Sequence, residues 1–327
     1  MKLATFSRNG AAPVIGAVDQ QRSRILDLQA CHRARTGSNH SDLVSMLALI
    51  DSGQRGLDLV LELMARFDSE DPPVTSSLSE VRLLAPVPEP RQIRDFSTFE
   101  RHLRDAPAAL ARMNARLAGV TPATASGPNA IPSVYLEQPI FYFSNRLNVI
   151  GTDTDVPWPR DSRFLDFELE LAICIGSPAK NVTPERAKQH IFGYTIFNDV
   201  SARDVQSVQM PGGLGPCKGK SYDGCNVIGP WLVTMDEIKN PYNLRATVRV
   251  NGEEWITTKT DGVVHRFEDM IAFASRDETV HAGEIFGTGT VGGCCGLELD
   301  RWIREGDLVE LEVEGIGVLR NRYVQVS

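Results

Sequence analysis

The sequence lacks three features that would indicate a nucleic acid, a membrane or an export route. It has no excess of basic residues, because 34 lysines and arginines stand against 42 aspartates and glutamates, for a formal net charge of −8. This balance argues against a broad nucleic-acid surface. It contains no run near the ~20 apolar residues of a membrane-spanning helix. Its opening, MKLATFSRNG, turns polar too early for a signal-peptide core. We therefore expect a cytoplasmic protein that binds neither nucleic acid nor membrane.

Cysteine is also scarce, with six residues and no C-x-x-C pair. This spacing indicates neither a zinc knuckle nor a disulfide framework. We expect the adjacent Cys294 and Cys295 to be reduced packing residues. A hydrophobic content of 42% and a charged content of 23% are typical of a globular protein. The default class is therefore a globular enzyme of one large domain or two smaller ones.

The N-terminal part is predicted to be a small α/β domain, residues 1–75. Short strands are expected over residues 1–35, and amphipathic helices over about 41–52 and 56–67. The acidic, proline-containing stretch SEDPPVTSSLSE follows, and its composition indicates a domain boundary. The second domain is then residues 76–327.

The second domain is predicted to be rich in short strands, which favours a β-roll or distorted barrel. Helices are expected over 184–190, with Thr183 as the N-cap, and over 266–275. The Ala-, Gly- and Pro-rich residues 107–132 predict a helix followed by a mobile loop. The expected strands are FYFSN, NVIGT, FLDFELELAICIG, IFGYTIFND, NVIGPWLVT, LRATVRV and DLVELEVEGIGVLRN.

One strand, FLDFELELAICIG (residues 164–176), places three acids on one face. Side chains two residues apart in a strand point the same way, so Asp166, Glu168 and Glu170 share a face. Such a pattern often marks a solvent-facing edge, but the apolar continuation LAICIG indicates a strand that enters a core. Asp199 ends another apolar strand, YTIFND. Carboxylates gathered at neighbouring strand ends predict a site for Mg²⁺ or Mn²⁺.

Further polar residues lie in three loops. RDFSTFERHLRD (residues 94–105) places Glu100 and His102 at a predicted loop-to-helix transition, where His102 would act as a general base if a carboxylate oriented it. KGKSYDG supplies Lys218 and Lys220, one of which would stabilise developing negative charge if it lay near a metal-bound anion, and SARDVQ supplies Arg203 and Gln206. GTGTVG satisfies G-x-G-x-x-G, but no helix pattern follows it, so a dinucleotide site is not predicted.

Taken in order, these motifs resemble the fumarylacetoacetate hydrolase family over most of residues 90–327. The matching segments are the lid motif RDFSTFERH, the strand DFELELA, FNDVSARDVQ, GPCKGKSYD and the C-terminal GTGTVGGCCGLELDRWIREGDLVELEVEGIGVLRN. The resemblance implies a β-rich α/β fold: a mixed β-roll or β-sandwich catalytic domain with a lid at about residues 100–134, preceded by the small N-terminal domain. It also implies a homodimer.

The resemblance further implies a carboxylate site for one divalent cation. By motif position the ligands are Glu168, Glu170 and Asp199, and Asp95 matches an acid that completes the shell in some members. The expected cofactor is Mg²⁺ or Mn²⁺, with Ca²⁺ as an alternative.

An acid–base pair is implied as well. His102 would be the base, held by Glu298 in GLELD, with Glu100 as a rival carboxylate because some smaller members take both partners from the lid. The residues assigned to the substrate side are Lys220, Gln206, Arg203, Thr290 and Gly289.

The implied activity is hydrolysis of a carbon–carbon bond in a 2,4-dioxo acid such as fumarylpyruvate, maleylpyruvate or a fumarylacetoacetate-like compound, as in the catabolism of aromatic compounds. Ser97 and the SNR segment at 144–146 depart from the animal fumarylacetoacetase pattern, which weakens the case for fumarylacetoacetate itself. A decarboxylase, a tautomerase and a 2-keto-3-deoxy sugar acid dehydratase or hydrolase remain as alternatives. A further alternative is a non-catalytic protein that binds keto acids, but such a protein would not need the predicted base.

Overall fold

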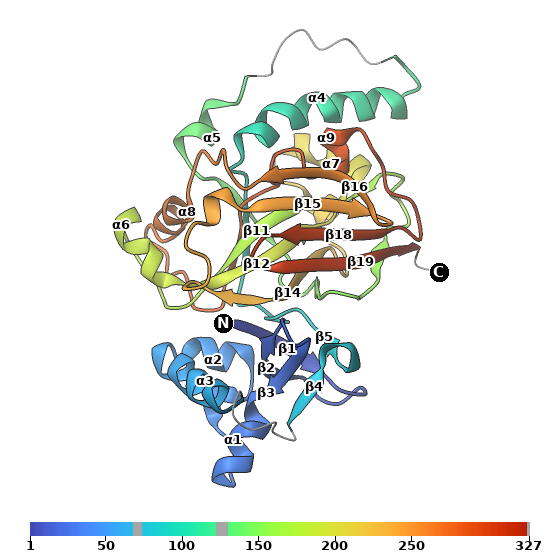
Figure 1. Ribbon diagram of the computed structural model, residues 1–327. Helices are drawn as coiled ribbons and strands as arrows, with labels where there is room; N and C mark the ends of the chain where they lie inside the picture. The colour runs from blue at the N-terminus through green and yellow to red at the C-terminus, as the bar shows by residue number, and fades with distance from the viewer. Residues whose placement is uncertain (68–73, 122–129, 326–327) are drawn as a thin grey trace.

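The computed structural model describes residues 1–67, 74–121 and 130–325. The chain forms a large strand-rich body with a smaller N-terminal lobe beneath it (Figure 1). This arrangement confirms the predicted β-rich α/β fold. Among the described residues, no helix is both long enough and apolar enough to cross a bilayer.

The largest sheet runs through both parts of the molecule. Across it the order is β4 (Thr75–Ser77), β3 (Arg24–Asp27), β2 (Val14–Asp19), β1 (Lys2–Ser7), β14 (Asn226–Thr234), β12 (Ile191–Asp199), β11 (Leu169–Ile175), β17 (Ile285–Gly287), β6 (Ile93–Phe96) and β7 (Phe141–Ser144). Two short strands lie beside this path, β5 (Arg82–Leu83) on β1 and β8 (Val149–Ile150) on β14.

A second sheet covers one face of the first. Its order is β16 (Glu253–Lys259), β15 (Arg245–Val250), β18 (Leu308–Val313), β19 (Gly317–Gln325) and β9 (Val156–Trp158). Figure 1 shows it in front of β11, β12 and β14. Leu169 and Leu171 of β11 share one buried apolar cluster with Leu311 and Leu319 of the second sheet. The main core therefore lies between the two sheets. Strand β16 was not predicted, because its residues are mostly exposed and polar.

The N-terminal lobe continues the large sheet rather than standing apart from it. Strand β1 pairs with β14, with Lys2 opposite Val233. The lobe also carries α1 (Leu28–Thr36), α2 (Met46–Asp51) and α3 (Gln54–Phe67). The strands predicted over residues 1–35 are correct as far as Asp27, where the chain turns into α1 because the Asp27 side chain accepts from the Ala30 amide. The predicted border at residues 75 and 76 falls inside β4, and the division itself stays a prediction.

Helix α4 (Glu100–Leu117) lies across the top of the larger part (Figure 1). It begins at Glu100, which confirms the loop-to-helix transition predicted there, and it continues through Pro107. Helix α5 (Ser133–Glu137) begins where the predicted lid, about residues 100–134, ends. The mobile loop predicted between them falls largely on residues 122–129, outside the described residues.

The remaining helices of the described chain are α6 (Pro184–Ala187) with a 3₁₀ turn to His190, α7 (Arg203–Gln209), α8 (Phe267–Ala274) and α9 (Gly296–Leu299). Two of these four, α6 and α8, stand where helices were predicted, whereas α7 and α9 were not predicted. Thr183 does stand at the N-cap of α6, but its side chain makes no capping hydrogen bond. The two-stranded sheet of β10 (Leu165–Asp166) and β13 (Ser201–Ala202) joins the acidic strand to the start of α7.

Candidate active site

Adjacent strands of the large sheet carry a row of polar residues. Strand β11 carries Glu170, and its neighbour β12 ends at Asp199. On the other side of β11, Gly287 of β17 pairs with Asp95 of β6, which in turn pairs with Tyr142 of β7. The sheet order thus assembles residues that are far apart in sequence.

The carboxylates of Asp95, Glu170 and Asp199 form a buried cluster. One oxygen from each lies within 4.8 Å of the others. In each residue one carboxylate oxygen is buried without a hydrogen-bond partner among the described residues: Oδ1 of Asp95, Oε1 of Glu170 and Oδ1 of Asp199. Burial, with repulsion from neighbouring acids, raises the pKa of Asp95 and Glu170 well above the ordinary range, and burial raises that of Asp199. A divalent cation would satisfy those oxygens, so the residues fit the predicted metal site.

Glu168 lies beside this cluster but pairs with cations of the chain itself. Its carboxylate contacts Lys220 Nζ at 2.5 Å and Arg203 Nη2 at 2.6 Å. Burial alone would raise the pKa of Glu168, but the charges of Arg203 and Lys220 hold it well below its usual value. Lys220 also forms an ion pair with Asp199. Lys220 therefore shares its charge between two of the predicted ligands.

Asp166, the first acid of the strand, has a structural role. Its Oδ1 accepts from the Gly296 amide at 2.7 Å, and its Oδ2 accepts from Arg203 Nε at 2.9 Å and from the Leu297 amide at 3.0 Å. The predicted alternation of acidic and apolar side chains along this stretch is confirmed, since Phe167, Leu169 and Leu171 all pack in the main core. Asp166 thereby ties the acidic strand to α9.

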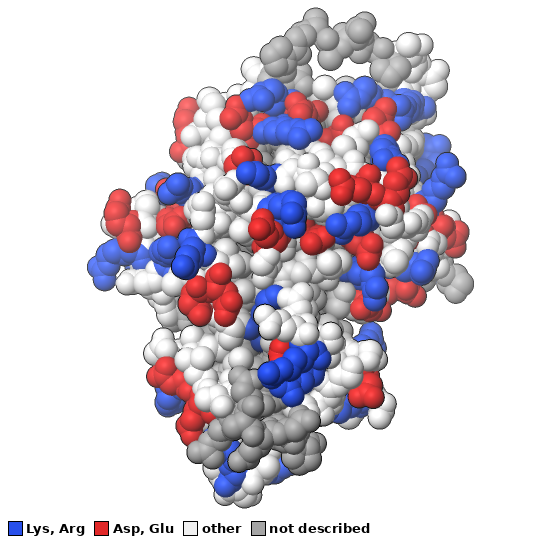
Figure 2. All heavy atoms as spheres, in the orientation of Figure 1, with Lys and Arg blue, Asp and Glu red and all other residues white. Residues whose placement is uncertain are grey.

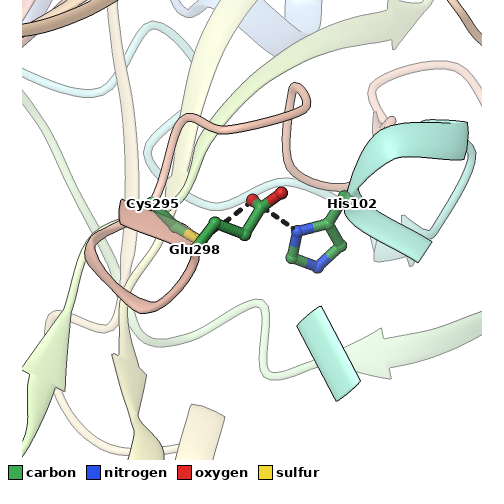
Figure 3. Close-up of side chains that lie close together, drawn as sticks. All are labelled: His102, Cys295 and Glu298. Atoms are coloured by element: carbon green, nitrogen blue, oxygen red, sulfur yellow. Dashed lines mark hydrogen bonds and ion pairs between the residues drawn. The ribbon is translucent and has the colours of Figure 1, made fainter. Parts of the chain in front are cut away.

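The predicted base and its orienting carboxylate meet at the junction of α4 and α9 (Figure 3). His102 Nδ1 lies 2.8 Å from Glu298 Oε2. Burial acts to raise the Glu298 pKa, but the adjacent His102 and hydrogen bonds from Cys295 and the Gly293 amide outweigh it, so the pKa is lowered. Glu100, the rival carboxylate, instead pairs with Arg104 on the exposed side of α4. Within the described residues it makes no hydrogen bond to His102.

The backbone links this pair to the acid cluster. Cys295, which contacts Glu298, forms an isolated β-bridge with Glu168. The Leu169 amide donates to the Cys294 carbonyl at 3.1 Å, so the acidic strand runs directly beside the loop that leads into α9. The His102–Glu298 pair and the carboxylates therefore border one another.

The residues assigned to the substrate side lie around the same cluster. Gln206 Oε1 accepts from Arg203 Nη1 at 3.2 Å, and the Gly289 amide donates to Glu170 Oε2 at 3.0 Å. The Thr290 hydroxyl is buried and has no hydrogen-bond partner in the described structure. Gly289 has φ +80°, and an added Cβ would lie 2.6 Å from the Phe96 carbonyl oxygen. Glycine is thus required where this loop approaches β6.

Sequence reasoning missed two residues of the site. Gly287 faces the carboxylates, and an added Cβ would lie 2.5 Å from Glu170 Oε2 and 2.7 Å from Asp95 Oδ1. Tyr142 donates its hydroxyl to Asp199 Oδ2 at 2.7 Å. The pairing of β17, β6 and β7 reveals both, because Tyr142 lies in no motif considered above and the motif that contains Gly287 gives no sign of a contact with carboxylates. The G-x-G-x-x-G match begins at Gly287, so its first glycine makes room for carboxylates.

The site's charges differ from those of the molecular surface. On the face in Figure 2, basic and acidic side chains are interspersed. The site acids are instead almost fully buried, with Asp199 and Glu170 at 0% exposure. Burying so many acids together is costly unless cations compensate them. Lys220 and Arg203 supply part of that compensation.

Comparison with known proteins places the chain in a family. The family profile described as "Fumarylacetoacetate (FAA) hydrolase C-terminal" matches residues 113–324. The mitochondrial oxaloacetate tautomerase fahd2 of Xenopus laevis is 35% identical over 189 residues, which are 58% of this chain and 59% of that protein. The human oxaloacetate tautomerase FAHD2A is 34% identical over the same length. The match therefore spans about three fifths of the length of these curated relatives.

Solved structures share the fold over the whole chain. A fumarylacetoacetate hydrolase from Exiguobacterium antarcticum superposes with a TM-score of 0.72 at 26% identity, covering 100% of both chains. Maleylpyruvate hydrolase from Sphingobium sp. SYK-6, in complex with manganese(II) and pyruvate, gives a TM-score of 0.72 at 24% identity, again over 100% of both chains. The profile match, supported by this likeness of fold, shows that the chain belongs to the fumarylacetoacetate hydrolase family.

Proposed function

We propose that this protein is a divalent-cation-dependent hydrolase that cleaves a carbon–carbon bond in a 2,4-dioxo acid of the acylpyruvate type. The products would be pyruvate, or a related keto acid, and a carboxylic acid. The observation that carries the proposal is the His102–Glu298 pair at 2.8 Å, bordering a buried carboxylate cluster. A protein that only bound keto acids would have no use for an oriented base.

The cation would be held by Asp95, Glu170 and Asp199, with Glu168 at its side. Three buried oxygens without a partner among the described residues support this set, and all-oxygen donors suit Mg²⁺ or Mn²⁺, with Ca²⁺ as an alternative. When bound, the cation would draw electron density from the keto acid's carbonyl group.

His102 would supply the proton transfers. The ionised Glu298 accepts a hydrogen bond from His102 Nδ1–H, which keeps the proton on Nδ1 and leaves the Nε2 lone pair as the base. Nε2 takes a proton from water, and the water oxygen forms a bond to the distal keto carbon. The bond between that carbon and its neighbour on the pyruvate side then breaks. The electron pair stays with the pyruvate fragment, which takes up a proton.

Lys220 and Gln206 would stabilise the negative charge that develops on the attacked oxygen. Although burial opposes a charge on Lys220, Asp199 and Glu168 raise its pKa above the usual value, so it stays an ammonium group. Arg203 holds Gln206 in place. Helix α4 carries His102 and covers the site, which would limit the entry of bulk water.

Tautomerisation of oxaloacetate is the second candidate, favoured by the curated relatives, whose names describe oxaloacetate tautomerases at about 35% identity. In that reaction His102 would move a proton between carbon and oxygen, and no water would attack. Decarboxylation of a 2-oxo acid and dehydration of a 2-keto-3-deoxy sugar acid would use the same acid–base residues.

Product analysis separates these candidates. The purified protein with Mn²⁺ is incubated with fumarylpyruvate and maleylpyruvate, with oxaloacetate, and with a 2-keto-3-deoxy sugar acid. Hydrolysis predicts pyruvate and a second carboxylic acid in equal amounts from an acylpyruvate, and a rate that collapses in His102→Ala. Turnover of oxaloacetate alone would refute the hydrolase assignment and leave the tautomerase.

A homodimer in the cytoplasm is proposed on the family resemblance alone. Size-exclusion chromatography with light scattering tests the assembly, and a monomer at assay concentrations would contradict it. Fractionation of the source cells tests the location; the curated relatives named above are mitochondrial by name.

A further inference from the structure

Two side chains, those of His102 and Cys295, form hydrogen bonds to the same carboxylate oxygen of Glu298. His102 Nδ1 lies 2.8 Å from Glu298 Oε2, and Cys295 Sγ lies 3.1 Å from the same oxygen. Figure 3 shows the imidazole and the sulfur approaching the carboxylate from two sides. The other oxygen, Oε1, accepts from the Gly293 amide at 3.0 Å, which fixes the carboxylate in place.

The three side chains form a compact donor set. One ligand atom from each lies within 4.8 Å of the others. Nitrogen, sulfur and oxygen donors together suit Zn²⁺ and similar thiophilic cations, which bind at about 2.0–2.3 Å from such atoms. The Asp95–Glu170–Asp199 cluster differs, because its donors are all oxygen and suit hard cations. The two clusters therefore select different metals.

We propose that His102, Cys295 and Glu298 form a second cation site, which takes Zn²⁺ or Cd²⁺ and thereby inhibits the enzyme. The cation binds His102 Nδ1, the Cys295 thiolate and a Glu298 oxygen, with water as the fourth ligand. The thiol proton leaves to solvent. The imidazole proton moves from Nδ1 to Nε2, so the ring stays neutral and binds the cation through its Nδ1 lone pair.

Inhibition follows from that tautomer. With a proton on Nε2, the ring has no lone pair left to accept a proton from water or substrate, so the proposed base is lost. This consequence depends on the proposed function, whereas cation binding does not. The two are therefore measured separately.

The surroundings explain why Cys295 would be the ligand among two adjacent cysteines. Cys295 packs with Ala109, Met113 and Leu297 beneath α4, whereas Cys294 belongs to the main core between the sheets. The thiols thus point in opposite directions. The His102 side chain is 14% exposed, which leaves the cluster open to solvent on that side.

Binding is tested with Cd²⁺, because a cadmium–thiolate bond gives a charge-transfer absorption that an all-oxygen site cannot produce. The titration is done on full-length protein carrying Cys217→Ser, which removes the exposed thiol. Cys294→Ser is the matched control for Cys295→Ser. We expect one saturable band in the parent and in Cys294→Ser, and none in Cys295→Ser. No saturable band in the parent, or a band that persists in Cys295→Ser, would overturn the proposal.

His102→Ala covers the case in which Cys295→Ser fails to fold. Circular dichroism checks the fold, and the Cd²⁺ affinity should fall by more than about tenfold, since loss of even an outer-shell partner has that effect. An unchanged affinity would exclude His102 as a ligand. Zn²⁺ should also inhibit the Mn²⁺-loaded enzyme in a way that additional Mn²⁺ does not reverse. Relief by Mn²⁺ would place the inhibition at the acid cluster instead.

Discussion

At the scale of single residues, Glu298 and Glu100 offer a matched test of the proposed base. Both are glutamates near His102 in the family motifs, but only Glu298 contacts the ring. Glu298→Gln keeps an acceptor for the Gly293 amide but removes the negative charge that holds the Nδ1 proton. We expect kcat to fall by roughly 10²–10⁴-fold, the usual contribution of a general base. Steady-state rates on the identified substrate measure the effect.

Glu100→Gln is the control for that variant. It removes a charge from the exposed side of α4, where Glu100 pairs with Arg104, and exposed pairs contribute little. Its rate should stay close to that of the parent. A large loss in Glu100→Gln with little change in Glu298→Gln would reverse the assignment and make Glu100 the orienting carboxylate.

Gly287 supports a second prediction at this scale. A Cβ at Gly287 would come within 2.5 Å of Glu170 Oε2 and 2.7 Å of Asp95 Oδ1, closer than van der Waals contact allows. Gly287→Ala should therefore push the carboxylates apart and weaken Mn²⁺ binding by roughly tenfold or more, an effect typical of disturbing the surroundings of a metal ligand. Isothermal titration calorimetry gives the affinity directly.

Gly212→Ala is the control, because an added Cβ at Gly212 meets nothing within 4 Å. It should bind Mn²⁺ as the parent does. Equal affinities for all three proteins would show that the cation is held away from Gly287.

These residues also show how far sequence reasoning reaches at this scale. The alternation of Asp166, Glu168 and Glu170 is local, so the face they share was predictable. The contact of Gly287 with Glu170 was not, because it depends on which strand lies beside β11, and sequence does not state that order. The family resemblance supplied Glu298 as the partner of His102; periodicity alone would have left Glu100 as an equal choice.

At the scale of elements, α4 positions His102 through its packing on α9. Met113 is 1% exposed and shares an apolar cluster with Leu297 and Cys295. Met113→Ala should lower the free energy of unfolding by about 2–4 kcal/mol, as expected for a buried methionine. It should also lower kcat, because α4 would seat less firmly against Glu298. Chemical denaturation and steady-state kinetics measure the two effects.

The neighbouring exposed Asn114 provides the control. Asn114→Ala should change stability by less than about 0.5 kcal/mol and leave the rate unchanged. If Met113→Ala lost stability but kept the parental rate, packing of α4 would not determine the position of His102.

The course of α4 past Pro107 depends on tertiary packing. Proline removes a backbone donor and normally disfavours the interior of a helix. The structure shows a helix that continues through Pro107, because Ala109 and Met113 on one side are buried against α9. Tertiary packing outweighs the local cost there. The same reasoning applies to β16, a polar strand held mainly by its pairing with β15.

At the scale of the whole molecule, the N-terminal lobe and the site share one sheet. Residues of the lobe such as Leu3 and Ile15 pack in one buried cluster with Ala172 and Cys174 of β11. These two residues follow Glu170 on the same face of that strand, so the acid-bearing face continues into the apolar contact with the lobe. The composition of the linker indicated a boundary, but it could not show that hydrogen bonds between β1 and β14 cross it.

Because the acid cluster lies within this continuous sheet, its charge state should affect the stability of the whole protein. The pKa values of Asp95 and Glu170 are raised from ordinary values of 3.8 and 4.5 by burial and neighbouring acids. In cation-free protein these groups do not lower the free energy of unfolding at pH values below their ordinary pKa values, because they are protonated in both the folded and the unfolded chain. Their cost grows as pH rises towards the raised values, because the unfolded chain releases their protons first.

Bound Mn²⁺ compensates the ionised carboxylates and adds about 2.7 kcal/mol when present at a hundred times its Kd. Protons compete with the cation, so its benefit falls at acid pH. We therefore expect the Tm difference between Mn²⁺-loaded and chelator-treated protein to increase from pH 5 towards pH 7. The raised pKa values make the cation-free protein less stable as pH rises, whereas the bound cation compensates the same charges. Differential scanning calorimetry measures this Tm difference.

Glu170→Gln should abolish most of the Tm difference, whereas Glu254→Gln, which changes an exposed acid, should retain it. A difference that shrinks as pH rises, or that survives in Glu170→Gln, would show that the cation binds elsewhere.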